Sequence, residues 1–278
     1  MPGRTSHTDE VEAWRARRLA RLTAPDGWLT LVGLEWLQEG ANPIGSDPSN
    51  LVGLPGGKAP PQLGSIEVSE GKATIEVRPG SGVTHEGRPI TRMGLRDDTD
   101  GDPTVLRLGT LSFHVINREG ALAVRIKDRH SPIRTGFRGI DHYPVDPRWR
   151  IEARFDAYDP PKETLVPDVL GRGQTYRLPG AVVFEVEGMT HRLETFLEAG
   201  ERDLFLVFGD ETNGDETYGG GRYLYAAPPD ERGIVVVDFN MAYNPPCVFT
   251  PYATCALPLP ENRLPIRIEA GEKRYRQR

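Results

Sequence analysis

The sequence has few cysteines and no pair of histidines at metal-ligand spacing. Its two cysteines, Cys247 and Cys255, are too few for a disulfide framework, so we expect reduced thiols in a cytoplasmic protein. The six histidines are scattered singly along the chain. The G-x-S-x-G, Walker, C-x-x-C and H-E-x-x-H motifs are also absent. We therefore predict neither a metal site nor an organic cofactor.

Long apolar runs and a positive charge balance are also lacking. No stretch approaches the roughly 20 apolar residues of a membrane span, and Met1–Glu10 lacks the apolar stretch of a signal peptide. The net charge of −6 disfavours the basic face that phosphate binding needs. We therefore expect a soluble protein that binds neither membranes nor nucleic acids. The sequence contains no indication of an oligomeric state.

Glycine and proline, in contrast, are abundant. The chain has 31 glycines and 25 prolines, spread along its length, and 37% hydrophobic residues. Frequent turns between short elements favour an all-β chain with enough apolar residues for a core. Two acidic stretches, Arg96–Asp102 and Asp210–Glu216, faintly resemble calcium loops. Their spacing does not match that of calcium loops, which favours solvated turns.

The periodicity predicts one helix and about a dozen antiparallel strands. Asp9–Leu22 has acidic residues at its start and arginines near its end, as a helix dipole prefers. We expect a single domain over residues 1–278, either barrel-like or a sandwich, with a soft boundary near Tyr143–Pro147. The alternating runs around Glu70-Gly71 predict a hairpin, and Glu119-Gly120 is expected to be a turn between two strands. Strand signals cover Trp28–Leu37, Ser65–Val77, Thr104–Asp128, Trp149–Tyr158, Ala181–Val186, His191–Phe196, Asp203–Phe208, Tyr223–Ala226 and Ile234–Phe239, and a short β region is expected near Arg263–Glu269.

A block of three glycines precedes an arginine in the segment TYGGGRYLY (217–225). Successive glycines let the backbone approach another strand or a ligand closely. The planar fork of Arg222 could hold a carboxylate or phosphate of a substrate, with Tyr218 beside it. The alternative is a glycine bulge in which Arg222 pairs with a nearby acid such as Asp210.

A second polar block, DFNMAYNPPC (238–247), follows an apolar strand. Asp238 and Asn240 share one face by the two-residue period of a strand, and Tyr243 and Asn244 follow. We consider Asp238 as a general base and the other three residues as substrate-binding groups.

The two cysteines allow several interpretations. The rigid loop of Pro245 and Pro246 could present Cys247 as a nucleophile, although a free cysteine is more often an apolar filler. His114 or His130 could approach Cys247 in space. Cys247 and Cys255 could also form a regulatory disulfide if their Cα atoms lie within about 7 Å. A shared soft metal is a further alternative, for which two ligands are weak support.

Taken together, these motifs resemble those of the domain of unknown function 1684 family. The resemblance is carried by Gly209-Asp210, Thr217–Arg222, Asp238–Asn240, Tyr243–Cys247, Thr254-Cys255, Leu257-Pro258, Asn262–Leu264 and Ala270–Glu272, with further motifs at Gly27–Leu29, Gly33-Leu34, Tyr143–Val145 and Trp149-Arg150. It suggests similarity over nearly the whole chain. It implies a stand-alone prokaryotic β-rich protein and no assigned activity. Ala256 departs from the family pattern, which has a proline after the second cysteine.

Three functional hypotheses remain open. The first is a small-molecule enzyme of hydrolase or lyase type, acting on an anionic substrate in a pocket formed by the C-terminal loops. The second is a ligand-binding β module without catalysis. The third is structural: Arg222, Asp238 and Asn240 form a buried polar network that holds irregular loops.

Overall fold

The computed structural model describes residues 6–198 and 200–276. Two compact units make up the chain: unit 1 comprises Met1–Leu22, Arg138–Phe249 and Thr254–Arg278, and unit 2 comprises Thr23–Phe137 and Thr250–Ala253. The described residues form seventeen strands in three sheets. The predicted all-β class with one N-terminal helix is confirmed, with more strands than the dozen expected. The single domain expected over residues 1–278 stays a prediction.

The N-terminal helix α1 (His7–Leu22) belongs to unit 1 and begins two residues before the predicted start. Ser6 caps it: the Ser6 hydroxyl accepts the Asp9 N–H at 3.2 Å, and the Asp9 carboxylate accepts the Ser6 N–H at 3.2 Å. These reciprocal bonds fix where the helix starts. Val11 and Leu22 are buried, and Trp14 packs on the ring of Tyr243 with centroids 6.2 Å apart.

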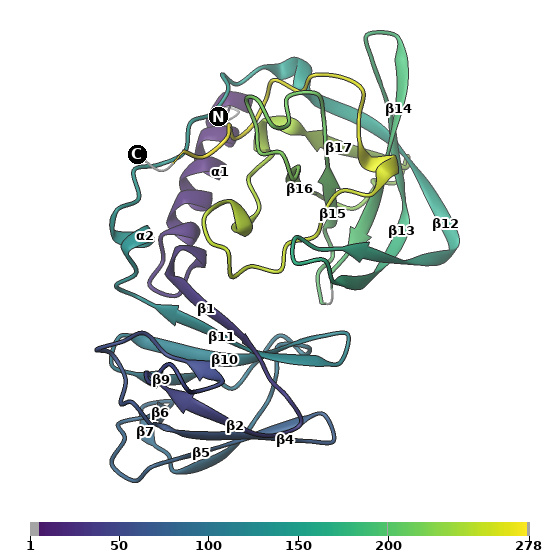
Figure 1. Cartoon of the computed structure of the whole chain (residues 1–278). Helices are drawn as coiled ribbons and strands as arrows, with labels where there is room; N and C mark the ends of the chain where they lie inside the picture. Colours follow the sequence, from purple (N-terminus) through teal and green to yellow (C-terminus); the bar gives the residue numbers. More distant parts are fainter. Residues whose placement is uncertain (1–5, 199, 277–278) are drawn as a thin grey trace, which may run out of the picture. The chain divides into compact units, whose positions relative to one another are not determined.

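The main sheet of unit 1 is a half-barrel of six antiparallel strands, ordered β16-β15-β14-β13-β12-β17. In Figure 1 its strands curve around the upper part of the picture, and β16 lies close to β17 at the open side. The inner side chains, among them Phe184, Phe208 and Phe239, form one apolar core. The strands are β12 (Arg150–Pro167), β13 (Gly173–Val186), β14 (Met189–Leu197), β15 (Leu204–Phe208), β16 (Arg222–Ala226) and β17 (Ile234–Asp238).

Irregular segments follow and precede these strands in unit 1. Four of them contain short 3-10 helices, η2 (Pro147–Trp149), η3 (Phe239–Met241), η4 (Pro246–Val248) and η5 (Pro260–Asn262). The β region expected near Arg263–Glu269 is wrong as a strand. Its residues alternate between exposed and buried, burying Leu264, Ile266 and Ile268, but single backbone bonds and side chains hold them in place of a ladder.

Unit 2 contains two sheets that share one apolar core, as in a sandwich. The first has the order β1-β11-β10-β9-β6-β7, and the second β3-β2-β4-β5-β8, in which β2 and β3 run parallel. The strands are β1 (Leu31–Trp36), β2 (Gly40–Gly45), β3 (Val52–Gly53), β4 (Gly64–Ser69), β5 (Lys72–Val77), β6 (Thr84–His85), β7 (Arg88–Pro89), β8 (Arg92–Leu95), β9 (Leu106–Leu108), β10 (Leu111–Arg118) and β11 (Ala121–Asp128); η1 (Trp28–Thr30) and the short helix α2 (Pro132–Thr135) flank β1 and β11.

The two turns predicted in unit 2 are confirmed, and both join the strands of a hairpin. Glu70-Gly71 joins β4 to β5, with φ of 52° and 71°, and Glu119-Gly120 joins β10 to β11, with φ of 51° and 85°. Positive φ at both central residues is the geometry that matches the twist of a two-residue hairpin. In both turns a glutamate occupies the first central position and a glycine the second.

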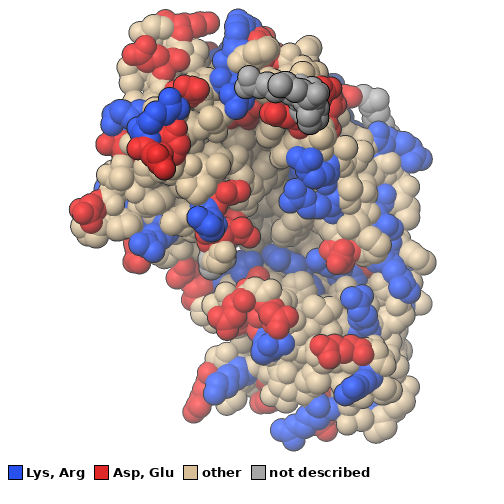
Figure 2. All heavy atoms as spheres, turned by 180° about the vertical axis from the view of Figure 1, so that it is seen from behind, with Lys and Arg blue, Asp and Glu red and all other residues tan. Residues whose placement is uncertain are grey.

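Two observations concern the surface. No helix in the part of the chain that the structure describes is long and apolar enough to cross a bilayer. On the face drawn in Figure 2, lysine and arginine side chains are interspersed with aspartate and glutamate.

Candidate functional site

The predicted site residues all lie in unit 1, where they form four groups of contacts. Arg222 pairs with Asp210, Asp238 with Asn240, Tyr243-Asn244 with the last segment of the chain, and Tyr218 with Cys247. In the first three groups the polar side chains are bound mainly to other parts of the protein. The fourth group contains a partly exposed cysteine, Cys247.

Arg222 begins β16 and is completely buried. One of its terminal nitrogens donates to Asp210 Oδ2 at 2.7 Å and to the Ile268 carbonyl at 2.9 Å, and the other donates to the Ala270 carbonyl. Asp210 also accepts from the N–H and the hydroxyl of Thr212, at 2.8 and 2.6 Å. Of the two interpretations of Arg222, the structure has the one in which it pairs with Asp210. The bonds to Ile268 and Ala270 attach the C-terminal segment to β16.

Asp238 ends β17 and is 8% exposed. Its Oδ1 accepts from the backbone and side-chain nitrogens of Asn240, at 3.1 and 2.9 Å, and its Oδ2 lies 2.6 Å from His7 Nε2. Asn240 in turn binds both the N–H and the carbonyl of Asp146, each at 2.9 Å. Both carboxylate oxygens of Asp238 are therefore engaged within the protein.

Tyr243 and Asn244 lie beneath α1. The guanidinium of Arg18 lies over the Tyr243 ring, 4.5 Å from its centroid, and donates to the Asn244 carbonyl at 2.9 Å. The fully buried Glu272 accepts the Asn244 N–H at 2.7 Å and pairs with Arg18 at 3.3 Å. Burial raises the pKa of Glu272, and Arg18 opposes that shift. The group ties the helix to the end of the chain.

Tyr218, Cys247 and Cys255 form a cluster, which we call the thiol cluster. The Cys247 N–H donates to Cys255 Sγ at 3.2 Å, and Cys247 Sγ lies 3.6 Å from the Tyr218 hydroxyl. Cys247 is partly exposed, whereas Cys255 is buried at 6% exposure. The fold thus places side by side the two cysteines that the disulfide and shared-metal interpretations had paired.

The hydrogen bonds of the thiol cluster divide its protons unequally. The bond from Cys255 lowers the pKa of Cys247 and outweighs burial, with a further contribution from Tyr218. The same bond to Cys247, followed by burial, raises the pKa of Cys255. Burial, followed by the bond to Cys247, raises the pKa of Tyr218. Cys247 is therefore the group that ionises first, and the other two remain donors.

The three glycines explain how Tyr218 is positioned. A Cβ on Gly220 would lie 2.5 Å from Cε1 of the Tyr218 ring, so the ring folds back over a position without a side chain. Gly221 has φ of +89°, and a Cβ there would lie 2.5 Å from both the Phe208 carbonyl and Pro258 Cγ. The glycine run was expected to let the backbone approach another strand or a ligand closely. It approaches the Tyr218 ring and the end of β15 at Phe208.

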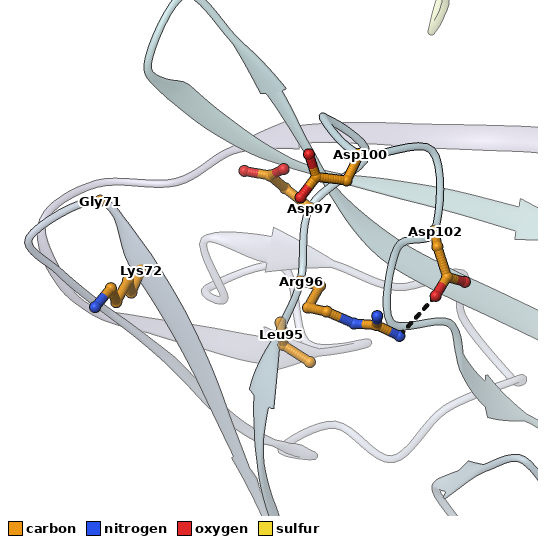
Figure 3. A pocket seen from close by; sticks show the side chains of 7 residues that line it. All are labelled: Gly71, Lys72, Leu95, Arg96, Asp97, Asp100 and Asp102. Atoms are coloured by element: carbon orange, nitrogen blue, oxygen red, sulfur yellow. Dashed lines mark ion pairs between the residues drawn. The ribbon is translucent and has the colours of Figure 1, made fainter. Parts of the chain in front are cut away.

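A cavity of about 230 Å³ lies elsewhere, in unit 2 (Figure 3). Its lining residues are Gly71, Lys72, Leu95, Arg96, Asp97, Asp100 and Asp102. Arg96 pairs with Asp102 at 2.9 Å, and both side chains are largely exposed. Among the described residues, no three His, Cys, Asp or Glu side chains are placed to hold a metal ion. None of the predicted site residues lines this cavity.

Sequence reasoning missed His7, Arg18 and Glu272. His7 and Arg18 come from a helix more than 200 residues before their partners, so no local spacing could have indicated these contacts. Glu272 was among the residues of the family motif, but nothing marked it as buried. Cys255 was considered only as a partner of Cys247, which is where the structure places it.

Comparisons with known proteins provide a family and no activity. One solved structure, a solution NMR structure of an uncharacterised protein from Haloarcula marismortui, shares 30% identity over 50% of this chain and 78% of its own, with a TM-score of 0.43. Another, from a study of phosphothreonine-dependent FHA domain interactions, shares 22% identity over 35% of this chain and 96% of its own, with a TM-score of 0.24. Scores below 0.5 carry no functional argument.

No curated protein matches the chain. The sequence profile of a family described as proteins of unknown function (DUF1684) matches residues 135–273. This is half of the chain, and the match lies almost wholly within unit 1. The resemblance had suggested similarity over nearly the whole chain, but the profile matches only this half. The chain belongs to the DUF1684 family.

Proposed function

We propose that this protein is a small-molecule enzyme of hydrolase type in which Cys247 is the nucleophile. The observation that carries the proposal is the thiol cluster. Cys247 is partly exposed and is held on a loop between prolines. Its sulfur lies 3.6 Å from the Tyr218 hydroxyl, and its backbone N–H donates to the sulfur of Cys255 at 3.2 Å. A thiolate stabilised in this way is the form of cysteine that attacks electrophiles.

The chemistry requires few groups. The Cys247 thiolate attacks the carbonyl carbon of an ester or thioester, the bond to the leaving group breaks, and an acyl-thioester forms on Cys247. The raised pKa of Tyr218 keeps its hydroxyl protonated at neutral pH, so it can give its proton to the leaving group. Water then hydrolyses the acyl-thioester and restores the thiol. Tyr218 regains its proton from solvent.

The proposal changes the roles first considered for the other residues. Arg222 is buried and bound to Asp210 and two carbonyls, so nothing supports its use as a clamp for an anionic substrate. Asp238 and Asn240 bind His7 and Asp146, which supports a structural role for them in the polar network. We accordingly propose no preference for an anionic substrate and no base other than solvent.

The alkylation rate of Cys247 with iodoacetamide, measured against pH, tests the proposal. The rate should rise with a midpoint below the pKa of about 8.5 that is usual for a free thiol, because the thiol cluster stabilises the thiolate. Tyr218→Phe should move the midpoint to higher pH, since the hydroxyl contributes to that stabilisation. Peptide mass spectrometry locates the adduct, and Cys247→Ser should abolish it.

Ester turnover is the second readout. Wild-type protein incubated with short-chain esters and thioesters should give an acyl adduct on Cys247 in intact mass, and Cys247→Ser should give none. For the alkylation experiment, the same protein unfolded in urea is the control that shows the midpoint of an ordinary thiol. An alkylation midpoint of the folded protein equal to that in urea would contradict the proposal. Ester turnover by Cys247→Ser equal to that of the wild type would contradict it as well.

Gly220→Ala should change the reactivity of Cys247 through the position of Tyr218, with both side chains kept. The added Cβ, 2.5 Å from Cε1 of Tyr218, forces the ring and its hydroxyl away from Cys247. We expect the alkylation midpoint to rise by about as much as in Tyr218→Phe. Gly219→Ala is the matched control, because the nearest atom to its Cβ would lie 3.6 Å away, at ordinary contact distance. Equal midpoints for both alanine variants would refute this positioning of Tyr218.

A further inference from the structure

Cys255 is held beside Cys247 by backbone contacts from two sides. The turn between β12 and β13 contributes Val169, whose N–H donates to the Cys255 carbonyl at 3.0 Å, and the Leu257 N–H donates to the Pro167 carbonyl at 2.8 Å. On the other side, the Tyr223 hydroxyl donates to the Ala256 carbonyl at 2.9 Å. These bonds fix the backbone on both sides of Cys255.

The backbone of Cys247 is fixed as well. Cys247 lies in η4, which follows Pro245, and the Val248 N–H donates to the Pro245 carbonyl at 3.1 Å. The contact between Cys247 N and Cys255 Sγ, 3.2 Å long, places the second sulfur against the backbone of the first cysteine. Cys247 N is one bond from its own Cα and Cys255 Sγ is two bonds from its Cα, so this contact brings the two residues close to the Cα separation of about 7 Å within which a disulfide forms.

The two thiols differ in access. Cys247 is partly exposed and meets a solute first, whereas Cys255 is 6% exposed and lies behind it. This is the arrangement of a reacting thiol with a protected second thiol. Two free cysteines placed only to fill a core would both be expected to be buried, whereas Cys247 is partly exposed.

We propose that Cys247 and Cys255 form a reversible disulfide when the protein meets a hydroperoxide, with Cys247 as the reacting thiol and Cys255 as the resolving thiol. The inference rests on the proposed reactivity of Cys247 and adds a regulation of that site. In the first step the Cys247 thiolate attacks the peroxide O–O bond. Cys247 becomes a sulfenic acid, and the peroxide leaves as an alcohol, or as water from hydrogen peroxide, after taking one proton.

In the second step the sulfur of Cys255 attacks the sulfur of the sulfenic acid. The S–S bond forms, the S–O bond breaks, and the hydroxide leaves as water with the proton of Cys255. The two thiols thereby lose two electrons to the peroxide. The hydrogen bond to Cys247 and burial raise the pKa of Cys255, followed by the charge of the Cys247 thiolate, and oxidation of Cys247 removes that charge.

The disulfide would switch off the nucleophile, since the sulfur of Cys247 is no longer free to attack a carbonyl carbon. A small dithiol that reduces the bond should restore it. The site is therefore inhibited by peroxide and reactivated by thiols, with no other group of the protein involved.

The test treats the reduced protein with one equivalent of hydrogen peroxide and then blocks remaining thiols with N-ethylmaleimide. We expect the intact mass to fall by two hydrogens with no maleimide added, and non-reduced peptide mapping to join the peptides of Cys247 and Cys255. Dithiothreitol should reverse both changes. Cys255→Ser should instead accumulate a sulfenic acid on Cys247 that dimedone traps.

Two results would overturn the inference. One is a wild-type protein that accumulates dimedone-reactive Cys247 as Cys255→Ser does, and the other is undiminished peroxide consumption by Cys247→Ser. Two further measurements on the same protein separate the two proposals. Fast iodoacetamide labelling of Cys247 without disulfide formation refutes only the switch. Disulfide formation without any acyl adduct after incubation with esters refutes only the hydrolase.

Discussion

Replacing Arg222 with methionine is expected to lower the free energy of unfolding by about 3–5 kcal/mol, because it leaves a buried charge without its partner. Asp210 Oδ2 would lose its ion pair at 2.7 Å, and the carbonyls of Ile268 and Ala270 would lose their donors. Methionine fills a similar volume, so the loss comes mainly from the unpaired polar groups. Arg222→Lys keeps the charge but lacks the planar fork, so its free energy of unfolding should lie between those of the wild type and Arg222→Met.

Arg267→Met is the matched control for this substitution. Arg267 pairs with Glu216 and Glu269, but its side chain is 41% exposed, and an exposed pair contributes about 0–1 kcal/mol. Urea unfolding followed by circular dichroism measures both variants. A loss for Arg222→Met no larger than that for Arg267→Met would mean that the Arg222 network does not stabilise unit 1.

Replacing Asn262 with alanine should lower the free energy of unfolding by at least about 3 kcal/mol, because three buried groups each lose a partner at about 1–3 kcal/mol. Asn262 is completely buried. Its side chain accepts the Glu194 N–H at 2.7 Å and donates to the Glu194 and Val207 carbonyls at 3.0 and 2.9 Å.

The position of Asn262 explains this effect. Among the described residues, the ladder between β14 and β15 consists of one pair, Phe196 with Phe205, so the amide of Asn262 replaces backbone bonds that the two strands do not make. Glu261→Ala, an exposed neighbour in η5, is the control and should change the stability by less than about 0.5 kcal/mol. Similar urea midpoints for the two variants would contradict this role.

Local patterns were enough to predict the helix and the hairpins. Acidic residues near the start of α1, and the Glu-Gly turns at residues 70–71 and 119–120, act within a few residues of the structure they cause. The lengths of β12 and β13 were missed, because a long exposed hairpin has little apolar alternation to mark it. The segment after Asn262 alternates like a strand, yet it is held by single backbone bonds and by side chains such as Arg222, which no periodicity reveals.

The same contrast holds for the candidate site. The polar block after β17 and the three glycines could be found in the sequence, and the pairing of Arg222 with Asp210 was one of the alternatives considered. The contacts of Asp238 with His7 and of Asn244 with Glu272 depend on how distant segments pack. The residue types indicated that these positions are special, but burial decided which of them remain available for chemistry.

Composition, turn residues and amphipathic period act locally, so they were enough to predict the all-β class, the N-terminal helix and the segment that carries the distinctive residues. The partners of Arg222 and Asp238 inside the protein, and the contact of the partly exposed Cys247 with Cys255, depend on tertiary packing. Exposure, pairing and pKa are set by groups brought together from far along the chain, and no local pattern contains them.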